Sequence, residues 1–319
     1  MAELALIIGN GFDIDLGLPS KYSDFANSPE FHDLTRRMHD MYFAEERDNS
    51  LVLQIQKAAI ESNWFDIEEE IHKFVASHSY LKEEMVRMVH SEFDSLKKAL
   101  VKYLKRVSKD LEHKADKTRL AYQLKYNLQY SPLSKIDIYF NYTTSELFLE
   151  RVTYHEPGKG TFTYVHGSLR YDDIVLGCDL QQEEQVNNQL SFMYKYNQIH
   201  QANHIARNLL EAKEIIFFGH SINEMDFCYF KEFFRKASAT PDPIRHLTII
   251  TYDEESERAI KDNIQNQGIS VSDLYSNLWT FDIIHTKSRC RTVIFFVIYG
   301  SGFKIGSEHL TFIKKYDII

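Results

Sequence analysis

Short apolar runs separated by longer polar segments form the main hydrophobic pattern of this chain. The first run, at residues 3–8, stops at Gly9-Asn10-Gly11, which is typical of a buried strand that ends in a turn. Similar runs lie at residues 136–140, 162–165, 174–176, 214–218 and 247–251. Because strands that are buried on both faces belong to parallel sheets, the pattern predicts an α/β fold with a mostly parallel sheet flanked by helices.

Residues 22–130 have a different pattern, with few glycines and many Lys, Glu and Gln residues. Apolar residues recur there at spacings of three and four, as in Met85, Val86, Val89, Phe93, Leu96, Leu100, Tyr103 and Leu104. Such a block is too long for a simple crossover between strands, so we expect a large all-helical insertion or cap. The sheet-containing core then consists of residues 1–21 and 131–319, with further helices at about 187–212 and 254–266.

Charge and cysteine content narrow the function classes. The 319 residues carry 37 Lys and Arg against 46 Asp and Glu, so the chain has no general attraction for phosphate backbones and nucleic acid is not an expected partner. Cys178, Cys228 and Cys290 form neither a zinc pair nor an even disulfide framework, which favours a reducing compartment. No apolar run approaches the roughly 20 residues that cross a bilayer. We expect a cytoplasmic protein without a membrane anchor or bound metal, and a homo-oligomer stays open.

The turn after the first run is the first candidate binding feature. Gly9 and Gly11 lack side chains that would block a close approach of phosphate to the backbone, and Asn10 lies between them. A dinucleotide fingerprint would have a third glycine where this chain has Ile14, so a plain tight turn explains the two glycines about as well. We expect Asp13 either to cap the turn or to meet a ribose hydroxyl, and Gly11 to serve ligand approach more than stability.

Polar residues follow three further predicted strands. Asn141 and His166 stand at two strand ends, and Gly219 and Ser221 stand at another, in a loop suited to contact a nucleotide. In open parallel sheets, ligands bind outside the carboxyl ends of the strands. Each residue also has a structural interpretation, as a turn former or a half-buried histidine, and for Asp226 we favour a cap of the next helix.

Weaker patterns are less informative. His200 and His204 have a spacing that can bind metal, but no third ligand is evident and a surface position is favoured. Trp64, Asp66 and Glu68 fall at a predicted helix start, where carboxylates favour the positive end of the helix dipole. A nucleophile elbow of the G-x-S-x-G type and a Walker A lysine are both missing, which excludes α/β-hydrolases and P-loop NTPases.

Taken together, the motifs resemble those of the AbiH family of bacterial phage abortive-infection proteins. The resemblance rests on residues 7–13 (I-I-G-N-G-F-D), 16–22 (L-G-L-P-S-K-Y), 63–68 (N-W-F-D-I-E), 165–167 (V-H-G) and 218–226 (F-G-H-S-I-N-E-M-D). It implies an antiviral role, with a defence-system partner or a phage trigger. It also makes the segment around Trp64 a functional or architectural signature.

More distantly, the order of the motifs is similar to that of sirtuin-like NAD-consuming domains. That resemblance implies a Rossmann-like sheet that binds NAD, with Asn141 and His166 at the cleavage site. It assigns the first-turn glycines, Gly9 and Gly11, and the later loop at Gly219 and Ser221 to the dinucleotide. The zinc cysteines of protein deacetylases have no counterpart here, so deacetylation is not expected.

The chemistry implied by this second resemblance is hydrolysis of the nicotinamide–ribose bond of NAD. Such cleavage passes through an oxocarbenium-like sugar and benefits from a base whose pKa lies near the operating pH, which suits His166. Asn141 would orient water and the ribose. Two alternatives stay open: a nucleotide-sensing module that binds without cleaving, and a metal-dependent nuclease that uses Asp13, Asp66, Glu68 and Asp226.

Overall fold

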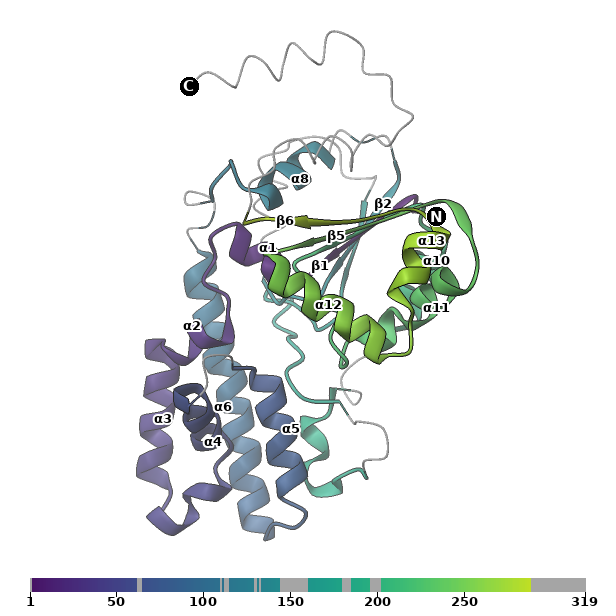
Figure 1. Cartoon of the computed structure of the whole chain (residues 1–319). Coiled ribbons are helices and arrows are strands. Elements are labelled where there is room, and N and C mark those ends of the chain that lie inside the picture. Colours follow the sequence, from purple (N-terminus) through teal and green to yellow (C-terminus); the bar gives the residue numbers. More distant parts are fainter. Residues whose placement is uncertain are drawn as a thin grey trace.

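The computed structural model describes residues 2–61, 65–109, 111, 115–128, 131, 133–143, 160–179, 185–195 and 202–287. Its centre is a six-stranded sheet in which all neighbouring strands are parallel, in the order β3-β2-β1-β4-β5-β6 (Figure 1). The strands are β1 (Leu4–Ile8), β2 (Lys135–Tyr139), β3 (Gly160–Tyr164), β4 (Glu214–Phe218), β5 (Asp242–Thr251) and β6 (Leu278–His285). The predicted α/β fold with a parallel sheet is confirmed.

Two strand predictions differ from the structure. Residues 174–176 do not form a strand, because Ile174 and Leu176 are buried against the helical cap instead of joining the sheet. The sequence pattern also missed β6, in which buried Leu278, Phe281 and Ile284 are separated by exposed or half-buried residues. An edge strand of this kind lacks the continuous apolar run that identified the central strands.

Helices cover both faces of the sheet (Figure 1). One face packs against α10 (Ala202–Glu211), α11 (Lys231–Ala239), α12 (Glu254–Asn266) and α13 (Val271–Asn277). The other face packs against α1 (Asn10–Asp15) and α8 (Leu120–Leu128), where Leu124 and Leu128 join the apolar cluster of Leu6 and Ile8. The helix predicted at 254–266 is confirmed as α12. The stretch predicted as helix at 187–212 holds the 3₁₀ helix η2 (Asn188–Met193) and α10, with residues 196–201 outside the described part.

The remaining helices form a cap with an apolar core of its own. They are α2 (Tyr22–Ala26), α3 (Pro29–Met41), the 3₁₀ helix η1 (Ala44–Asn49), α4 (Leu51–Glu61), α5 (Ile67–Ser77) and α6 (Glu83–Ser108). The α6 residues Phe93, Leu96 and Leu100 are buried in this core, as their spacing predicted. Leu169 and Leu190, from the chain after β3, are buried in the same cluster, so that segment joins the cap to the sheet. No described helix has both the length and the apolar character needed to cross a bilayer.

Three glycines bring the ends of β1 and β4 into backbone contact. The Gly11 N–H donates to the Gly219 carbonyl at 2.9 Å, and Gly9 N–H donates to the Phe218 carbonyl at 2.9 Å. A Cβ at position 11 would lie 2.6 Å from Gly219 Cα, closer than real side chains approach. Gly219 also has a φ of +63°, which L-residues rarely adopt. The expectation that Gly11 matters little for stability is therefore wrong, because the two loops can meet only without side chains.

We predict that Gly219→Ala lowers the free energy of unfolding by about 2 to 4 kcal/mol, since it adds a backbone clash to the cost of a left-handed alanine. Gly268→Ala is the matched control, because Gly268 has a φ of +76° but open space where a Cβ would lie. That control is expected to lose only about 1 kcal/mol. Urea unfolding of both variants measures the difference, and equal losses would show that the close approach contributes nothing.

Candidate functional site

The candidate site lies at the carboxyl ends of β3, β2, β1 and β4. Strand order reverses between β1 and β4, the switch point at which open parallel sheets bind ligands. Beyond the strands the register continues, as Phe140 N–H donates to the Ile8 carbonyl and Val165 N–H to the Tyr139 carbonyl, both at 2.8 Å. This continuation keeps Asn141 and His166 on adjacent strand ends, as the sequence predicted for residues of one site.

The glycine turn after β1 uses much of its own hydrogen-bonding capacity internally. The amide of Gly9 donates to Phe218, the last residue of β4, and the amide of Gly11, in the first turn of α1, donates to Gly219. The Phe12 amide donates to the Gly9 carbonyl. The exposed Asn10 side chain points to the half-buried Ser20, whose Oγ donates to Asn10 Oδ1 at 2.5 Å. These hydrogen bonds connect the end of β1 and the start of α1 to the end of β4. The predicted contact of this segment with a dinucleotide stays a prediction.

Asp13 anchors the loop that follows β2. Its fully buried carboxylate accepts hydrogen bonds from Asn141 Nδ2 at 2.8 Å and from Thr143 Oγ1. Because a carboxylate can only accept, the amide group of Asn141 must turn its nitrogen toward Asp13. Asn141 Oδ1 then points away from Asp13, and this buried oxygen has no hydrogen-bond partner among the described residues.

His166 pairs with Asp226, which comes from the loop after β4. His166 Nε2 lies 3.0 Å from Asp226 Oδ1, and His220 Nε2 lies 3.5 Å from Asp226 Oδ2. The favoured interpretation of Asp226 as a helix cap is wrong, since its side chain makes no capping bond to the following 3₁₀ helix η4 (Phe227–Tyr229). Burial would raise the pKa of Asp226, but hydrogen bonds from the two histidines outweigh it and hold that pKa well below its usual range.

Unsatisfied polar atoms mark the same strand ends. His166 Nδ1 is buried without a hydrogen-bond partner in the described part of the chain, and the same holds for Ser168 Oγ. His166 is only 4% exposed and Asn141 only 6% exposed, so bulk water does not reach these atoms freely. Because an unmade hydrogen bond of a buried group costs about 1 to 3 kcal/mol, these three atoms, which lie on strand ends that follow β2 and β3, are candidates for contact with a ligand.

The helical cap contributes a buried ion pair next to these strand ends. Lys195 Nζ, which is fully buried, lies 2.7 Å from Glu68 Oε2 at the start of α5. The Tyr142 hydroxyl lies 3.1 Å from Glu68 Oε1 and 3.0 Å from the Val175 carbonyl. Burial alone would lower the pKa of Lys195, but the Glu68 and Asp226 carboxylates outweigh it and raise that pKa well above normal. Glu68 in the cap therefore interacts with Tyr142, which follows β2, and Lys195 interacts electrostatically with Asp226, which follows β4.

Asp66 begins α5 and belongs to the same group of charges. Its carboxylate caps the helix by accepting the Glu68 N–H at 2.8 Å. Burial, and then the charge of Glu68, raise the pKa of Asp66 to about 6. The expectation that Asp66 marks a helix start is confirmed, whereas Trp64, two residues earlier, lies outside the described residues.

Two other candidate residues are exposed. The Ser221 residue is exposed, and its carbonyl accepts a hydrogen bond from Asn263 Nδ2 at 3.0 Å. His204 is exposed on α10, and His200 falls outside the described part. Within the described ranges no three His, Cys, Asp or Glu side chains are arranged to hold a metal ion.

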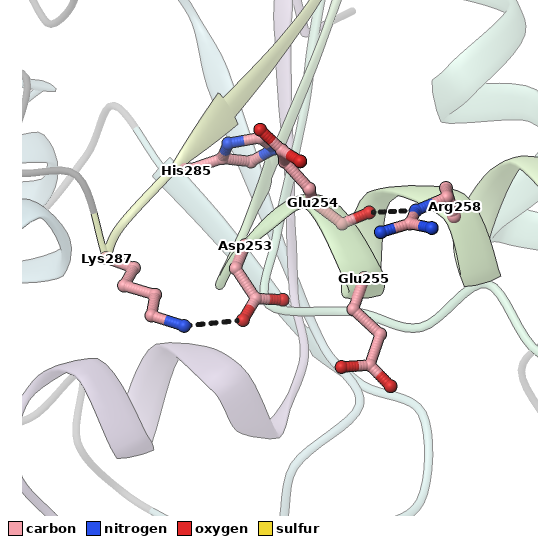
Figure 2. A pocket seen from close by; sticks show the side chains of 6 residues that line it. All are labelled: Asp253, Glu254, Glu255, Arg258, His285 and Lys287. Carbon is pink, nitrogen blue, oxygen red and sulfur yellow. Dashed lines mark hydrogen bonds and ion pairs between the residues drawn. The ribbon is translucent and has the colours of Figure 1, made fainter.

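Two hollows accompany the sheet edge. A pocket of about 390 Å³ lies at the ends of β5 and β6. Figure 2 shows the side chains that line it, with Lys287 Nζ at 3.1 Å from Asp253 Oδ2. A groove of about 660 Å³ runs between α6 and residues 172–175. Its wall includes Val175, whose amide donates to the His166 carbonyl at 2.7 Å.

Only some of the residues in this cluster were predicted from the sequence. It singled out Asp13, Asn141 and His166, but it did not identify the histidine partner role of Asp226 or the contributions of His220 and Lys195. The segment 218–226, quoted as a motif, contains the signal for two of these three. Lys195 belongs to no motif in the sequence, and it meets Glu68 only in the folded structure.

A family model described as "Bacteriophage abortive infection AbiH" matches residues 5–244, which is more than half of the chain. The match begins in β1 and ends within β5, so it includes the glycine turn, the cap and the His166–Asp226 pair. No curated protein matches the chain significantly.

We predict that Lys195→Met lowers the free energy of unfolding by about 3 kcal/mol, because it leaves the Glu68 carboxylate buried without its counter-charge. Adding Glu68→Gln should restore part of this loss, and a double-mutant cycle with urea unfolding measures the coupling. The control is Arg87→Met, which removes an exposed pair with Glu83 that is expected to contribute little. Additive losses at Lys195 and Glu68 would contradict a coupled buried pair.

Asp66 predicts a pH dependence of stability. Because the folded-state pKa of about 6 lies above the ordinary aspartate value of 3.8, the folded protein binds more protons between these pH values. The free energy of unfolding therefore falls as pH rises through this window. The loss approaches about 3 kcal/mol at pH 7. Asp66→Asn keeps a good capping residue but cannot ionise. Relative to the parent, the variant should gain that amount between pH 4 and pH 7 in urea unfolding, and parallel pH profiles would refute the assignment.

Proposed function

This chain belongs to the AbiH family of bacteriophage abortive-infection proteins, and from that premise we propose that it acts by binding NAD and hydrolysing the nicotinamide–ribose bond. The family membership supports an antiphage role. Loss of NAD would halt metabolism in an infected cell and with it the replication of the phage. The reaction and its substrate are the proposed part, and the candidate site supplies the support for them.

The unsatisfied buried atoms carry the proposal. Asn141 Oδ1 is a carbonyl oxygen and can only accept hydrogen bonds, while His166 Nδ1 is the ring nitrogen that faces away from Asp226. A ligand that completes an accepting pair of this kind must itself donate hydrogen bonds. Ribose hydroxyls, a carboxamide and water are donors, whereas phosphate oxygens at neutral pH are acceptors. The sugar and nicotinamide end of NAD therefore suits the ends of β2 and β3.

The switch point supports the placement of the rest of the dinucleotide. A ligand that starts at β2 and β3 and crosses the reversal of strand order passes over the joined loops of Gly9, Asn10 and Gly11 on one side and Gly219 on the other. We assign the pyrophosphate to this ridge of backbone, where side chains do not intrude. Ser221, exposed beyond it, is then available to the second nucleotide.

In the proposed reaction, His166 is the base and Asn141 orients the nucleophile. The bond between ribose C1 and the nicotinamide nitrogen breaks, its electron pair stays on nicotinamide, and a water oxygen bonds to C1. The proton lost by that water goes to His166 Nδ1 and then to solvent. Asp13 keeps Asn141 Oδ1 turned toward the water or the ribose by holding the amide nitrogen.

We predict that His166→Ala lowers NAD turnover by about 10²- to 10⁴-fold, the usual share of general acid–base catalysis, while NAD binding is largely kept. Asn141→Ala should have a similar effect, and the double variant should lose much less than the product of the two, since both residues serve one step. Release of nicotinamide from NAD measures turnover, and melting temperatures of all variants show whether the fold is intact. His204→Ala, an exposed histidine on α10, is the matched control and should keep full activity.

The same assay separates the alternatives. NAD binding without nicotinamide release, even when phage lysate is added as a trigger, would replace the hydrolase with a nucleotide-sensing module. Metal-dependent degradation of nucleic acid, lost on substitution of Asp13 or Glu68, would instead indicate a nuclease. A His166→Ala variant that loses stability and activity together would reduce this histidine to a structural role.

A further inference from the structure

Asp226 stands between two histidines, and each of its carboxylate oxygens faces one of them. His166 Nε2 is 3.0 Å from Oδ1 and His220 Nε2 is 3.5 Å from Oδ2. All three side chains are almost completely enclosed, with exposed side-chain fractions of 5%, 3% and 13% for His166, His220 and Asp226. In such a buried site, two donors that face each other are costly, because water cannot supply the missing acceptor. The position of each histidine proton therefore matters.

The proton of His220 is placed by the backbone. The Ile222 N–H donates to His220 Nδ1 at 2.9 Å, so Nδ1 must carry a lone pair and a neutral His220 holds its proton on Nε2. That Nε2–H points at Asp226. The Ile222 residue has a φ of +49°, an uncommon and costly conformation for a β-branched residue, and its side chain is fully buried. The loop is thus held in the form that presents this amide to His220.

The same reasoning extends to His166. An ionised carboxylate only accepts hydrogen bonds, so Asp226 requires a proton on His166 Nε2. A neutral His166 then has its lone pair on Nδ1, the buried atom without a partner among the described residues. We propose that Asp226 is a positioning residue that fixes His166 in the Nε2–H tautomer, which makes Nδ1 the atom that accepts the proton in the site. The catalytic role of this tautomer rests on the proposed function, whereas the assignment of the tautomer rests only on the hydrogen bonds of Asp226 and the two histidines.

Asp226 also favours the charged product of proton transfer. When Nδ1 takes a proton, His166 becomes an imidazolium whose Nε2–H already points at the carboxylate, so the new positive charge forms beside a negative one. His220 contributes by donating to the other oxygen, which keeps the carboxylate ionised and oriented. Lys195 adds a positive charge that acts on Asp226 in the same sense.

Asparagine at position 226 provides a sharp test, because its side chain has one donating and one accepting end. His220 cannot present a lone pair at Nε2 while its Nδ1 accepts the Ile222 N–H. The amide nitrogen of the asparagine must therefore turn toward His166, whose tautomer can switch without breaking another hydrogen bond. In Asp226→Asn, the His166 proton moves to Nδ1 and the lone pair that would act as base is lost.

The experiment is nitrogen NMR of the full chain labelled in its histidines, recorded without NAD, with His166 signals identified by their loss in His166→Gln. We expect Nε2–H in the parent and Nδ1–H in Asp226→Asn. NAD turnover of Asp226→Asn should fall by about 10²- to 10⁴-fold, as expected when a base is held in the wrong tautomer. Asp179→Asn removes a carboxylate that acts on the same charges without being the partner of His166 Nε2, and it should leave the His166 tautomer unchanged.

An Nδ1–H tautomer in the parent would overturn the inference, and this measurement needs no variant of Asp226 to fold. An unchanged Nε2–H tautomer in a folded Asp226→Asn would overturn it as well. If both tautomers are as expected but the parent never cleaves NAD, the proposed function fails while the role of Asp226 toward His166 is upheld.

Discussion

Burial of ionised side chains between the cap and the sheet is the constraint on which the rest of this structure depends. Three carboxylates of the candidate site each have partners: Glu68 has Lys195, Asp13 has Asn141, and Asp226 has two histidines. Removing an ion from water costs several kcal/mol unless hydrogen bonds and opposite charge replace the solvent. Displacing α5 would separate Glu68 both from Lys195 and from Tyr142, which follows β2.

The atoms left without partners gain their meaning from this background. Beside these paired carboxylates, the buried Asn141 Oδ1 and His166 Nδ1 have no hydrogen-bond partner among the described residues. Both belong to residues whose other polar atom is firmly held, by Asp13 in one case and Asp226 in the other. A side chain with one polar atom fixed by a hydrogen bond and the other still able to accept one is well suited to hold a ligand in a defined orientation.

Sequence patterns predicted the central strands well, because β1, β2 and β4 are continuous apolar runs that no other element explains. They missed β6, because exposed positions interrupt its apolar residues. They wrongly predicted a strand at residues 174–176, which are apolar because they pack against the cap. In the site, residues at strand ends could be found because topology brings such ends together. The partner of His166 could not be assigned in this way, since Asp226 also follows a loop and precedes a helix, where a cap is the commoner outcome. Lys195 depends on a contact 127 positions distant, which no local pattern contains.

The separation of the site residues along the chain also bears on synthesis. Asp13 meets Asn141 across 128 positions, Glu68 meets Lys195 across 127, and His166 meets Asp226 across 60. Domains fold as the ribosome releases them, and contacts this distant form only after both partners have emerged. A nascent chain therefore has no complete site until Asp226 has left the exit tunnel. If the site has the proposed activity, a chain that ends before Asp226 lacks it, because the partner of His166 is missing.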